Sequence, residues 1–321
     1  MLALALVAVT VVAPPAAKER LIAALGGALR DPVLASPRTG APLFRERTVL
    51  GRTVQLAYRE EDGGRLYRDN GAYVDLTPPG PDPTPDELLN SLMTAAAAFV
   101  QPAQFGQSLF RNPAVSWAYE RGWRQNFNAN GFPGIDQEFE EVQAFFAPVA
   151  QRGVVLDMSC GSGLMTRRLA ASGAYRRVIG ADYSESMLAE TARRFREEGM
   201  AVPDLVRCDV AALPVQSASL NAVHAGAALH CWPDAERGVG EIRRVLKPGG
   251  AFFATTFLTA ALIGTRRAGG RTGAGFRVFE LDELRGMLRD AGFVDVDVRQ
   301  AGRACAICRA RAPTPAAPSS E

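Results

Sequence analysis

Apolar, strand-like runs alternate with amphipathic helical stretches along the chain from Val154 onward. The strand-like runs are VVLDM, RVIGAD, LVRCD, LNAVHAG and AFFATTF, and the stretches between them carry apolar residues at helical spacing. Strands that alternate with helices form a parallel sheet covered by helices on both faces. Two last runs, VDVDVRQ and RACAICRA, are close enough in sequence to pair as an antiparallel hairpin. The pattern therefore predicts an α/β fold whose sheet ends in this hairpin.

The rest of the chain divides into segments of different composition. Residues 1–17 are an apolar run, shorter than the roughly 20 residues of a membrane-spanning helix, and we interpret them as a targeting-like or disordered segment. Strand-like runs separated by turn residues predict a small β-rich module over residues 18–78. A proline-rich stretch followed by helical spacing predicts a linker and a helix over residues 79–100. We expect the main domain over residues 101–311 and a disordered tail over residues 312–321.

The charge balance and the cysteines exclude some classes of protein. The 321 residues include 36 Lys and Arg against 34 Asp and Glu, and a net charge of +2 provides no strong attraction for nucleic acid or an anionic membrane. Five cysteines, an odd number, argue against a disulfide framework and for a reducing compartment. Cys305 and Cys308 form a C-x-x-C. Positions three apart in a strand face opposite sides of the sheet, so we interpret this pair as incidental.

Three acidic residues stand where successive predicted strands end. Asp157 ends the first strand and precedes the turn SCGSG, Asp182 ends the second strand, and Asp209 ends the third. Ligands of an open parallel sheet bind outside the carboxyl ends of its strands. At that edge Asp182 can accept the hydroxyls of a ribose and Asp209 an exocyclic amine, while the glycines of the turn let a ligand approach the backbone. Each acid alone is more often a helix or turn cap, but the three in order predict a nucleoside site.

The turn after Asp157 narrows the kind of nucleoside. A dinucleotide site uses G-x-G-x-x-G, whereas here Met165 and Thr166 end the corresponding stretch and the third glycine is missing. An acid at the head of the turn disfavours a pyrophosphate and favours a ligand with an ammonium or sulfonium group. The pattern therefore favours a sulfonium nucleoside, and an NAD-linked oxidoreductase is the less favoured alternative.

The motifs LDMSCGSG, GADYSESML, RCDVAALP and EIRRVLKPGG together resemble the successive motifs of class I S-adenosylmethionine-dependent methyltransferases, over about Val154 to Phe257. More narrowly, YERGWRQNF, GFPG and VHAGAALHCWPD resemble the UbiE-related methyltransferases of plant and algal plastids. The resemblance implies a Rossmann-like sheet of seven strands that ends in the antiparallel hairpin, and a methyltransferase domain over residues 101–311. It also implies S-adenosyl-L-methionine as cofactor and a plastid location, with the cytoplasm as the alternative.

The same resemblance implies roles for individual residues at the strand ends. The methionine part of the cofactor would lie against Asp157 and the turn, the ribose against Asp182, and the adenine against Asp209 with Val210. Ser159 stands where the family's loop has its first glycine, and a residue this small is compatible with binding. In full, the expected cofactor-binding residues are Asp157, Ser159, Cys160, Gly161, Gly163, Asp182, Tyr183, Met187, Asp209 and Val210.

Two segments are expected to face the methyl acceptor, one after the fourth strand and one before the first. His230 follows the fourth strand, and because the usual pKa of imidazole suits proton abstraction near neutrality, we name it as a candidate acid–base group, with a structural or pocket-lining role as the alternative. Tyr119 is a second catalytic candidate, and Arg124 and Trp232 are expected in the acceptor pocket. His224, inside the fourth strand, is interpreted as a packed residue.

The amino-terminal module resembles the small zinc ribbon of the plastid family, with one departure. Ser36 and Thr39, in SPRT, stand where that family has the thiolates of C-P-x-C. Hydroxyls are poor zinc ligands beside Cys or His, so we expect no metal and a ribbon-like module held by packing.

We expect methyl transfer to a small, lipophilic acceptor such as a prenylated quinone or phenol. Peripheral association with a membrane or lipid body is compatible with such an acceptor, and no nucleic-acid partner is expected. A catalytically silent, cofactor-binding scaffold of plastid lipid bodies is the main alternative.

Overall fold

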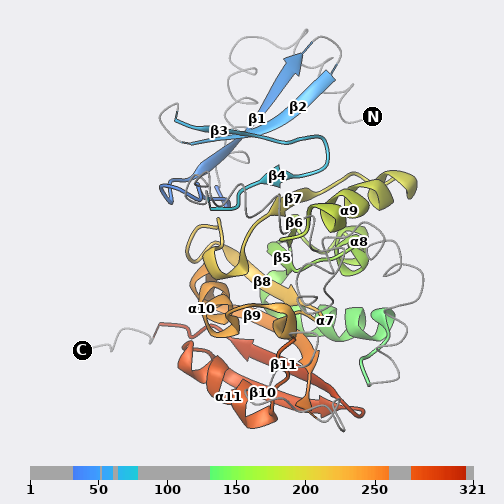
Figure 1. The fold of residues 1–321 in the computed structure, drawn as a ribbon, viewed down its shortest axis with the longest axis vertical. Coiled ribbons are helices and arrows are strands. Elements are labelled where there is room, and N and C mark those ends of the chain that lie inside the picture. Colours follow the sequence, from blue (N-terminus) through green and yellow to red (C-terminus); the bar gives the residue numbers. More distant parts are fainter. Residues whose placement is uncertain (1–31, 51–52, 61–63, 79–130, 260–275, 316–321) are drawn as a thin grey trace, which may run out of the picture.

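The computed structural model describes residues 32–50, 53–60, 64–78, 131–259 and 276–315, which form two sheets (Figure 1). The larger sheet has eight strands in the order β10-β11-β9-β8-β5-β6-β7-β4, and the smaller sheet has three in the order β1-β2-β3. Tyr119, Arg124, residues 1–17 and the helix predicted within 79–100 lie outside the described residues.

The larger sheet is parallel except for its last two strands. Strands β4 to β9 all run parallel, whereas β11 is antiparallel to β9 and β10 is antiparallel to β11. The bounds are β4 Val74–Asp75, β5 Val154–Met158, β6 Arg177–Asp182, β7 Asp204–Arg207, β8 Leu220–Ala225, β9 Leu246–Phe257, β10 Val294–Ala301 and β11 Cys305–Arg311. Strands β5 to β11 confirm the predicted seven-stranded sheet with its terminal hairpin, and β4 adds an edge strand from the amino-terminal module.

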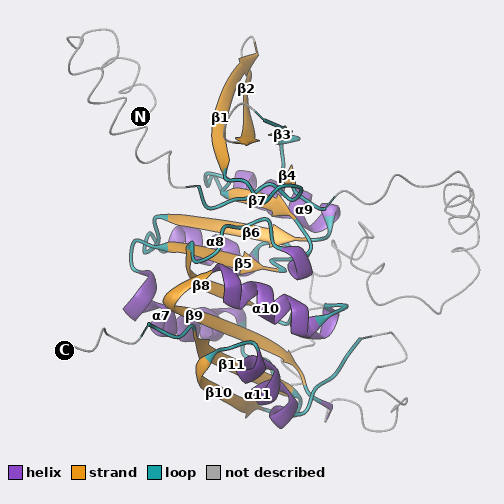
Figure 2. Cartoon of the chain, turned by 90° about the vertical axis from the view of Figure 1, so that its left-hand side faces the viewer, coloured by secondary structure: helices purple, strands orange, loops and turns teal. Residues whose placement is uncertain are grey.

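Helices cover both faces of this sheet (Figure 2). They are α7 Ile135–Ala150, α8 Leu164–Ala171, α9 Glu185–Glu197, α10 Ala235–Val245 and α11 Leu281–Asp290, with the short 3-10 helices η4 Val210–Ala212 and η5 Leu229–Cys231. Val155 and Phe253 join the apolar cluster under α7 and α8, whereas their neighbours Leu156 and Phe252 join the cluster under α10 and α11. Successive strand residues thus face opposite sides, and both sides are apolar because both are covered.

The C-x-x-C of β11 follows the same alternation. Cys305 belongs to the cluster under α7 and α8, and Cys308 belongs to the cluster under α10 and α11. Both cysteines are fully buried and free. The two thiols therefore lie on opposite faces of the sheet, as the strand spacing predicts.

The amino-terminal module stands beyond β7, at the opposite end of the molecule from the hairpin β10–β11 (Figure 1). It is an antiparallel meander of β1 Leu43–Leu50, β2 Thr53–Glu60 and β3 Leu66–Arg68. Asp204 of β7 ties it to the sheet, since it accepts hydrogen bonds from the Tyr58 hydroxyl at 2.6 Å and from Arg177 Nε at 2.7 Å. Burial alone would raise the pKa of Asp204, but Arg177 and Arg45 outweigh burial and lower it. The junction therefore contains an ionised carboxylate.

The hydroxyls of Ser36 and Thr39 close a turn in this module. Ser36 Oγ accepts the backbone N–H groups of Arg38 and Thr39, and Thr39 Oγ1 accepts that of Ala41. No group of three or more His, Cys, Asp or Glu side chains that could hold a metal ion occurs in the described part of the chain. Within that part, too, no helix is long and apolar enough to cross a membrane.

Candidate active site

The three acids predicted to bind a nucleoside lie at one edge of the larger sheet. β5 and β6 pair in parallel with Met158 opposite Ala181, and β6 and β7 pair with Asp182 opposite Arg207. The carboxyl ends of these strands, where Asp157, Asp182 and Asp209 stand, therefore face the same way. In an open parallel sheet this edge is where ligands bind.

The turn after β5 has three residues with left-handed backbone, which are Ser159 (φ 58°), Gly161 (φ 56°) and Gly163 (φ 79°). A Cβ on Gly163 would lie 2.5 Å from Thr191 Cγ2, so this position requires glycine for space as well as for conformation. Ser159 adopts a conformation that costs a non-glycine residue about 1–2 kcal/mol. Its hydroxyl accepts a hydrogen bond from Trp232 Nε1 at 3.0 Å, which offsets part of that cost.

Asp182 clamps this turn to the start of α9. Its carboxylate accepts the backbone N–H of Gly161 at 2.9 Å and that of Ser184 at 2.8 Å. Burial is the main cause of the raised pKa of Asp182, and the charge of Asp157 adds to it, while the two N–H groups oppose it. The residue remains partly accessible. Because a carboxylate offers about four lone-pair sites, Asp182 can still accept ligand hydroxyls.

Some of the predicted cofactor-binding residues near the end of β7 and the start of α9 are accessible, and others are buried. Asp209 caps η4 by accepting the N–H of Ala211 at 2.9 Å and is partly accessible, and Val210 beside it is buried. Tyr183 is 40% exposed and Met187 is 2% exposed, so the tyrosine ring is presented to solvent while the methionine side chain packs in the core.

Asp157 is turned into the fold rather than toward the turn. Its Oδ2 accepts from Thr166 Oγ1 at 2.5 Å, its Oδ1 lies 2.7 Å from His224 Nδ1, and the residue is 1% exposed. Both oxygens thus have partners inside the fold. The expected effect of Asp157 on the methionine part of a cofactor would act through its charge and through the backbone of the turn.

His224 is buried, as expected, but it also joins two carboxyl groups. Its Nε2 lies 3.3 Å from Glu138 Oε1 on α7, while its Nδ1 contacts Asp157. Sequence reasoning missed Glu138, although a signal exists. The buried residues of α7 are Glu138, Val142, Phe146 and Ala150, so an acid occupies the first position of an otherwise apolar stripe with a spacing of four residues.

His230 lies among aromatic rings after β8. Its ring meets Phe257 edge-on with centroids 4.9 Å apart and Phe276 at 5.7 Å, and Phe132 lies 4.5 Å from Phe257. Burial lowers the pKa of His230 to about 3, so the imidazole is neutral at physiological pH. So weak a base is poorly matched to proton abstraction near pH 7. This setting disfavours the acid–base role expected from the sequence and favours the structural or pocket-lining alternative.

Two further predicted site residues are enclosed by protein. Trp232 is 4% exposed and lies against Gly238, where a Cβ would come within 2.9 Å of its ring, so it packs in the core and bridges to Ser159. Cys160 is 9% exposed, and burial raises the pKa of its thiol well above the usual value, with Asp182 and Asp157 adding to the effect. Cys160 is therefore a protonated, buried thiol within the turn.

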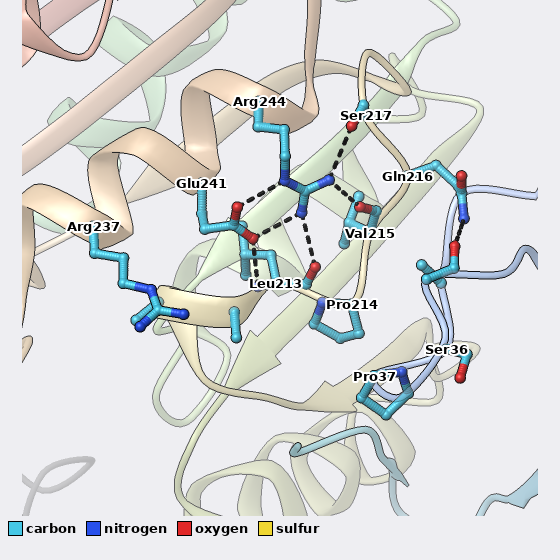
Figure 3. Close-up of a pocket in the computed structure, with 14 residues that line it drawn as sticks. Ser36, Pro37, Leu213, Pro214, Val215, Gln216, Ser217, Arg237, Glu241 and Arg244 are labelled. Atoms are coloured by element: carbon cyan, nitrogen blue, oxygen red, sulfur yellow. Dashed lines mark hydrogen bonds and ion pairs between the residues drawn. The ribbon is translucent and has the colours of Figure 1, made fainter. Parts of the chain in front are cut away.

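A cleft of about 470 Å³ lies elsewhere, between the amino-terminal module, the segment 211–217 and α10 (Figure 3). None of the predicted cofactor residues lines it. Figure 3 shows the Arg244 guanidinium bonded to Glu241, Ser217 and the carbonyl oxygens of Leu213 and Val215. These bonds hold the wall of the cleft together, so the cleft is a junction between the two parts of the chain and the strand-end site is separate from it.

Residues 156–254, which include the turn and the ends of β5 to β8, match the family described as a methyltransferase domain. The chain carries a methyltransferase domain. Together with the parallel sheet, this match supports the resemblance to class I methyltransferases over these residues, with S-adenosylmethionine as the cofactor of the matched domain.

Two relatives and one solved structure resemble the methyltransferase domain. The chain is 46% identical over 198 residues to an uncharacterised chloroplastic methyltransferase of Arabidopsis thaliana, covering 60% of this chain and 52% of the relative. It is 36% identical over 121 residues to a demethylmenaquinone methyltransferase of Clavibacter sepedonicus, covering 38% of this chain and 47% of that one. The structure of phosphoethanolamine N-methyltransferase 2 of Haemonchus contortus with S-adenosyl-L-methionine shares the fold, with a TM-score of 0.53 at 18% identity, over 64% of this chain and 60% of that one. The chain spans about half the length of the two relatives.

Proposed function

We propose that this chain is an S-adenosylmethionine-dependent methyltransferase whose acceptor is a small lipophilic molecule, a prenylated quinone or phenol. The main supporting observation is that several groups lie at one edge of the larger sheet. The carboxyl ends of β5 to β7 place a left-handed turn and two partly accessible carboxylates there, and a neutral imidazole among aromatic rings follows β8. The similarity to a demethylmenaquinone methyltransferase supports the quinone, and the chloroplastic relative supports a plastid location.

The groups at this edge fit the cofactor. Asp182 and Asp209 provide acceptors for ribose hydroxyls and the adenine amine, and the left-handed turn from Ser159 to Gly163 presents backbone for close approach. When bound, S-adenosylmethionine supplies an electrophilic methyl group on a sulfonium. What this chain's residues contribute is mainly alignment, which is worth roughly 7–11 kcal/mol in favourable intramolecular cases.

The acceptor side is apolar and weakly basic. Phe132, Phe257 and Phe276 offer ring surface for an aromatic acceptor, and the buried imidazole of His230 offers a neutral polar group. With its pKa lowered to about 3, His230 would hydrogen-bond the acceptor hydroxyl and leave deprotonation to another group.

The activity test uses the whole chain with tritium-labelled S-adenosylmethionine and separate prenylated quinols, prenylated phenols and matched unprenylated rings. We expect label in the organic extract with at least one prenylated acceptor and much less with its unprenylated partner. Equal labelling of both would remove lipophilicity from the proposal. Binding of the cofactor with no label in any acceptor or source lipid would favour the silent scaffold.

A binding test addresses the ribose contact. We expect Asp182→Ala to weaken S-adenosylhomocysteine binding by about 1.5–3 kcal/mol, the usual worth of hydrogen bonds to a charged group. Calorimetry measures the change, and Asp75→Ala, which alters the surface pair with Arg207, is the matched control. An unchanged dissociation constant for Asp182→Ala would remove this residue from the site.

A further inference from the structure

A continuous run of buried polar contacts links two loops of the candidate site. Thr166 Oγ1 donates to Asp157, Asp157 contacts His224 at 2.7 Å, His224 contacts Glu138 at 3.3 Å, and Thr255 Oγ1 donates to Glu138 at 3.2 Å. We call these five residues the His224 network. At its far end Thr255 Oγ1 accepts the backbone N–H of Ala227 at 2.7 Å, in the loop after β8. At its near end Asp157 is the second-last residue of β5, and one residue separates it from the turn that begins at Ser159.

The network is closely enclosed by backbone. A Cβ on Gly226 would lie 2.7 Å from His224 Cε1 and 3.0 Å from Glu138 Oε1, so the loop after β8 passes directly over the imidazole. Phe253 of β9 stacks against the same ring with centroids 6.0 Å apart. His224, Asp157 and Glu138 are each at most 2% exposed. Water therefore has little access to the network and cannot readily replace these contacts.

The two carboxyl groups determine the charge of His224. A neutral imidazole has one N–H and satisfies one carboxylate, whereas the protonated ring donates to both. Burial lowers the pKa of His224, but hydrogen bonds to Asp157 and Glu138 outweigh burial and raise it to about 9. Asp157 on β5 and Glu138 on α7 are the titratable groups that face this ring among the described residues, while α8 and β9 contribute the hydroxyls of Thr166 and Thr255.

We propose that His224 is a positioning residue for the cofactor's amino-acid part, holding Asp157 oriented beneath the turn after β5 and fixing the loop after β8 relative to it. This inference rests on the proposed function, because it assumes that S-adenosylmethionine binds over the turn. The carboxyl group of Asp157 is then held in one orientation near the turn over which the cofactor's ammonium group would lie. His224 itself touches no ligand, and its effect passes through Asp157.

The test measures the binding of two probes to the full chain by calorimetry. S-adenosylhomocysteine carries the amino-acid part, and 5′-methylthioadenosine lacks it. His224→Gln keeps a hydrogen-bonding side chain but removes the charge. We expect it to weaken S-adenosylhomocysteine binding about 5- to 150-fold, the usual range for coupling between sites, and to change methylthioadenosine binding by less than about twofold. Asp136→Asn, which alters an exposed ion pair with Arg168 on the same helix as Glu138, should leave both affinities within about twofold.

A pH series provides a readout that a merely structural role would not move. In the unmodified chain, S-adenosylhomocysteine binding should weaken relative to methylthioadenosine binding as pH rises through about 9. His224 then loses its proton and can no longer donate to both carboxyl groups. Glu138→Gln removes one of the two carboxylates that raise the pKa of His224, so the fall should begin at lower pH. The ligand's own amino group ionises in the same way with both proteins, so a displaced fall belongs to the protein.

The outcomes separate this inference from the proposed function. Equal loss of both probes in His224→Gln, or no loss of either, would overturn the positioning role. If His224→Gln does not fold, an identical pH series for Glu138→Gln and the unmodified chain would overturn it. If the unmodified chain binds neither probe, the proposed function itself fails. If it binds both and the variants behave like it, only the inference fails.

Discussion

His224 and His230 are both buried, yet their surroundings shift the pKa of imidazole in opposite directions. His224 and His230 are 2% and 6% exposed, but the pKa of His224 is raised to about 9 and that of His230 is lowered to about 3. Around His224 two carboxyl groups stabilise the cation, whereas around His230 the neighbours are aromatic rings and the Thr256 hydroxyl. Burial alone therefore does not determine protonation. The neighbours make His224 charged and His230 neutral at neutral pH.

The largest test of this contrast is the free energy of unfolding. His224→Gln leaves two buried carboxylates facing an uncharged side chain, and losing one partner of a buried ion pair costs about 3–5 kcal/mol. His230→Gln loses ring contacts but no ion pair, so we expect a cost of about 1 kcal/mol, within the usual range for single substitutions. Urea unfolding of both variants measures the difference. Equal costs would mean that the ion pairs of His224 add nothing to stability.

The second test is the pH dependence of stability, which should decline on both sides of about pH 6.5. Between about pH 6.5 and 9 the folded chain holds a proton on His224 that the unfolded chain has lost, so stability falls as pH rises, by about 3 kcal/mol in all. Between about pH 6.5 and 3 the unfolded chain binds a proton at His230 that the folded chain does not, so stability falls as pH falls.

The two histidine variants distinguish the alkaline decline in stability from the acid decline. Urea unfolding across pH should show that His224→Gln flattens the alkaline decline, while His230→Gln flattens part of the acid decline. An alkaline decline of unchanged size in His224→Gln would assign it to another group.

The smallest test concerns the hydrogen bond from Trp232 Nε1 to Ser159, which joins the segment after β8 to the turn after β5. Ser159→Ala removes the acceptor of Trp232 Nε1 while keeping a side chain at φ 58°, so we expect a loss of about 1–2 kcal/mol. Ser159→Gly also loses the bond but adopts this φ without strain, so it should cost less. Thermal unfolding compares the two variants. If glycine were the worse replacement, strain at Ser159 would not matter.

Local patterns predict some of these features and miss others. The strand-end acids and the opposite faces of Cys305 and Cys308 follow from periodicity along single strands, and the structure has both. The pairing of Glu138 with His224 joins residues 86 positions apart, so no local pattern contains it. The helical spacing of α7 places Glu138 in an apolar stripe without indicating its partner.

Site chemistry was harder to predict than position. The usual pKa of imidazole suggested an acid–base role for His230, but the rings that contact it come from β9 and from the segment before α11, and burial of the histidine removes its basicity. Ser159 was expected as a small substitute for glycine, and its left-handed backbone follows from the shape of the turn. The assigned roles of the cofactor residues stay predictions.

Strand β4 of the amino-terminal module covers the edge of the larger sheet at β7. Its two residues pair with Val206 and Arg207 of β7, and Asp75 also forms an ion pair with Arg207 at 2.7 Å. An uncovered edge strand has unpaired N–H and C=O groups that can pair with a strand of another molecule. A shortened protein that began after residue 78 would expose β7 in this way. Self-association of that fragment would then reflect an unprotected sheet edge rather than a property of the intact chain.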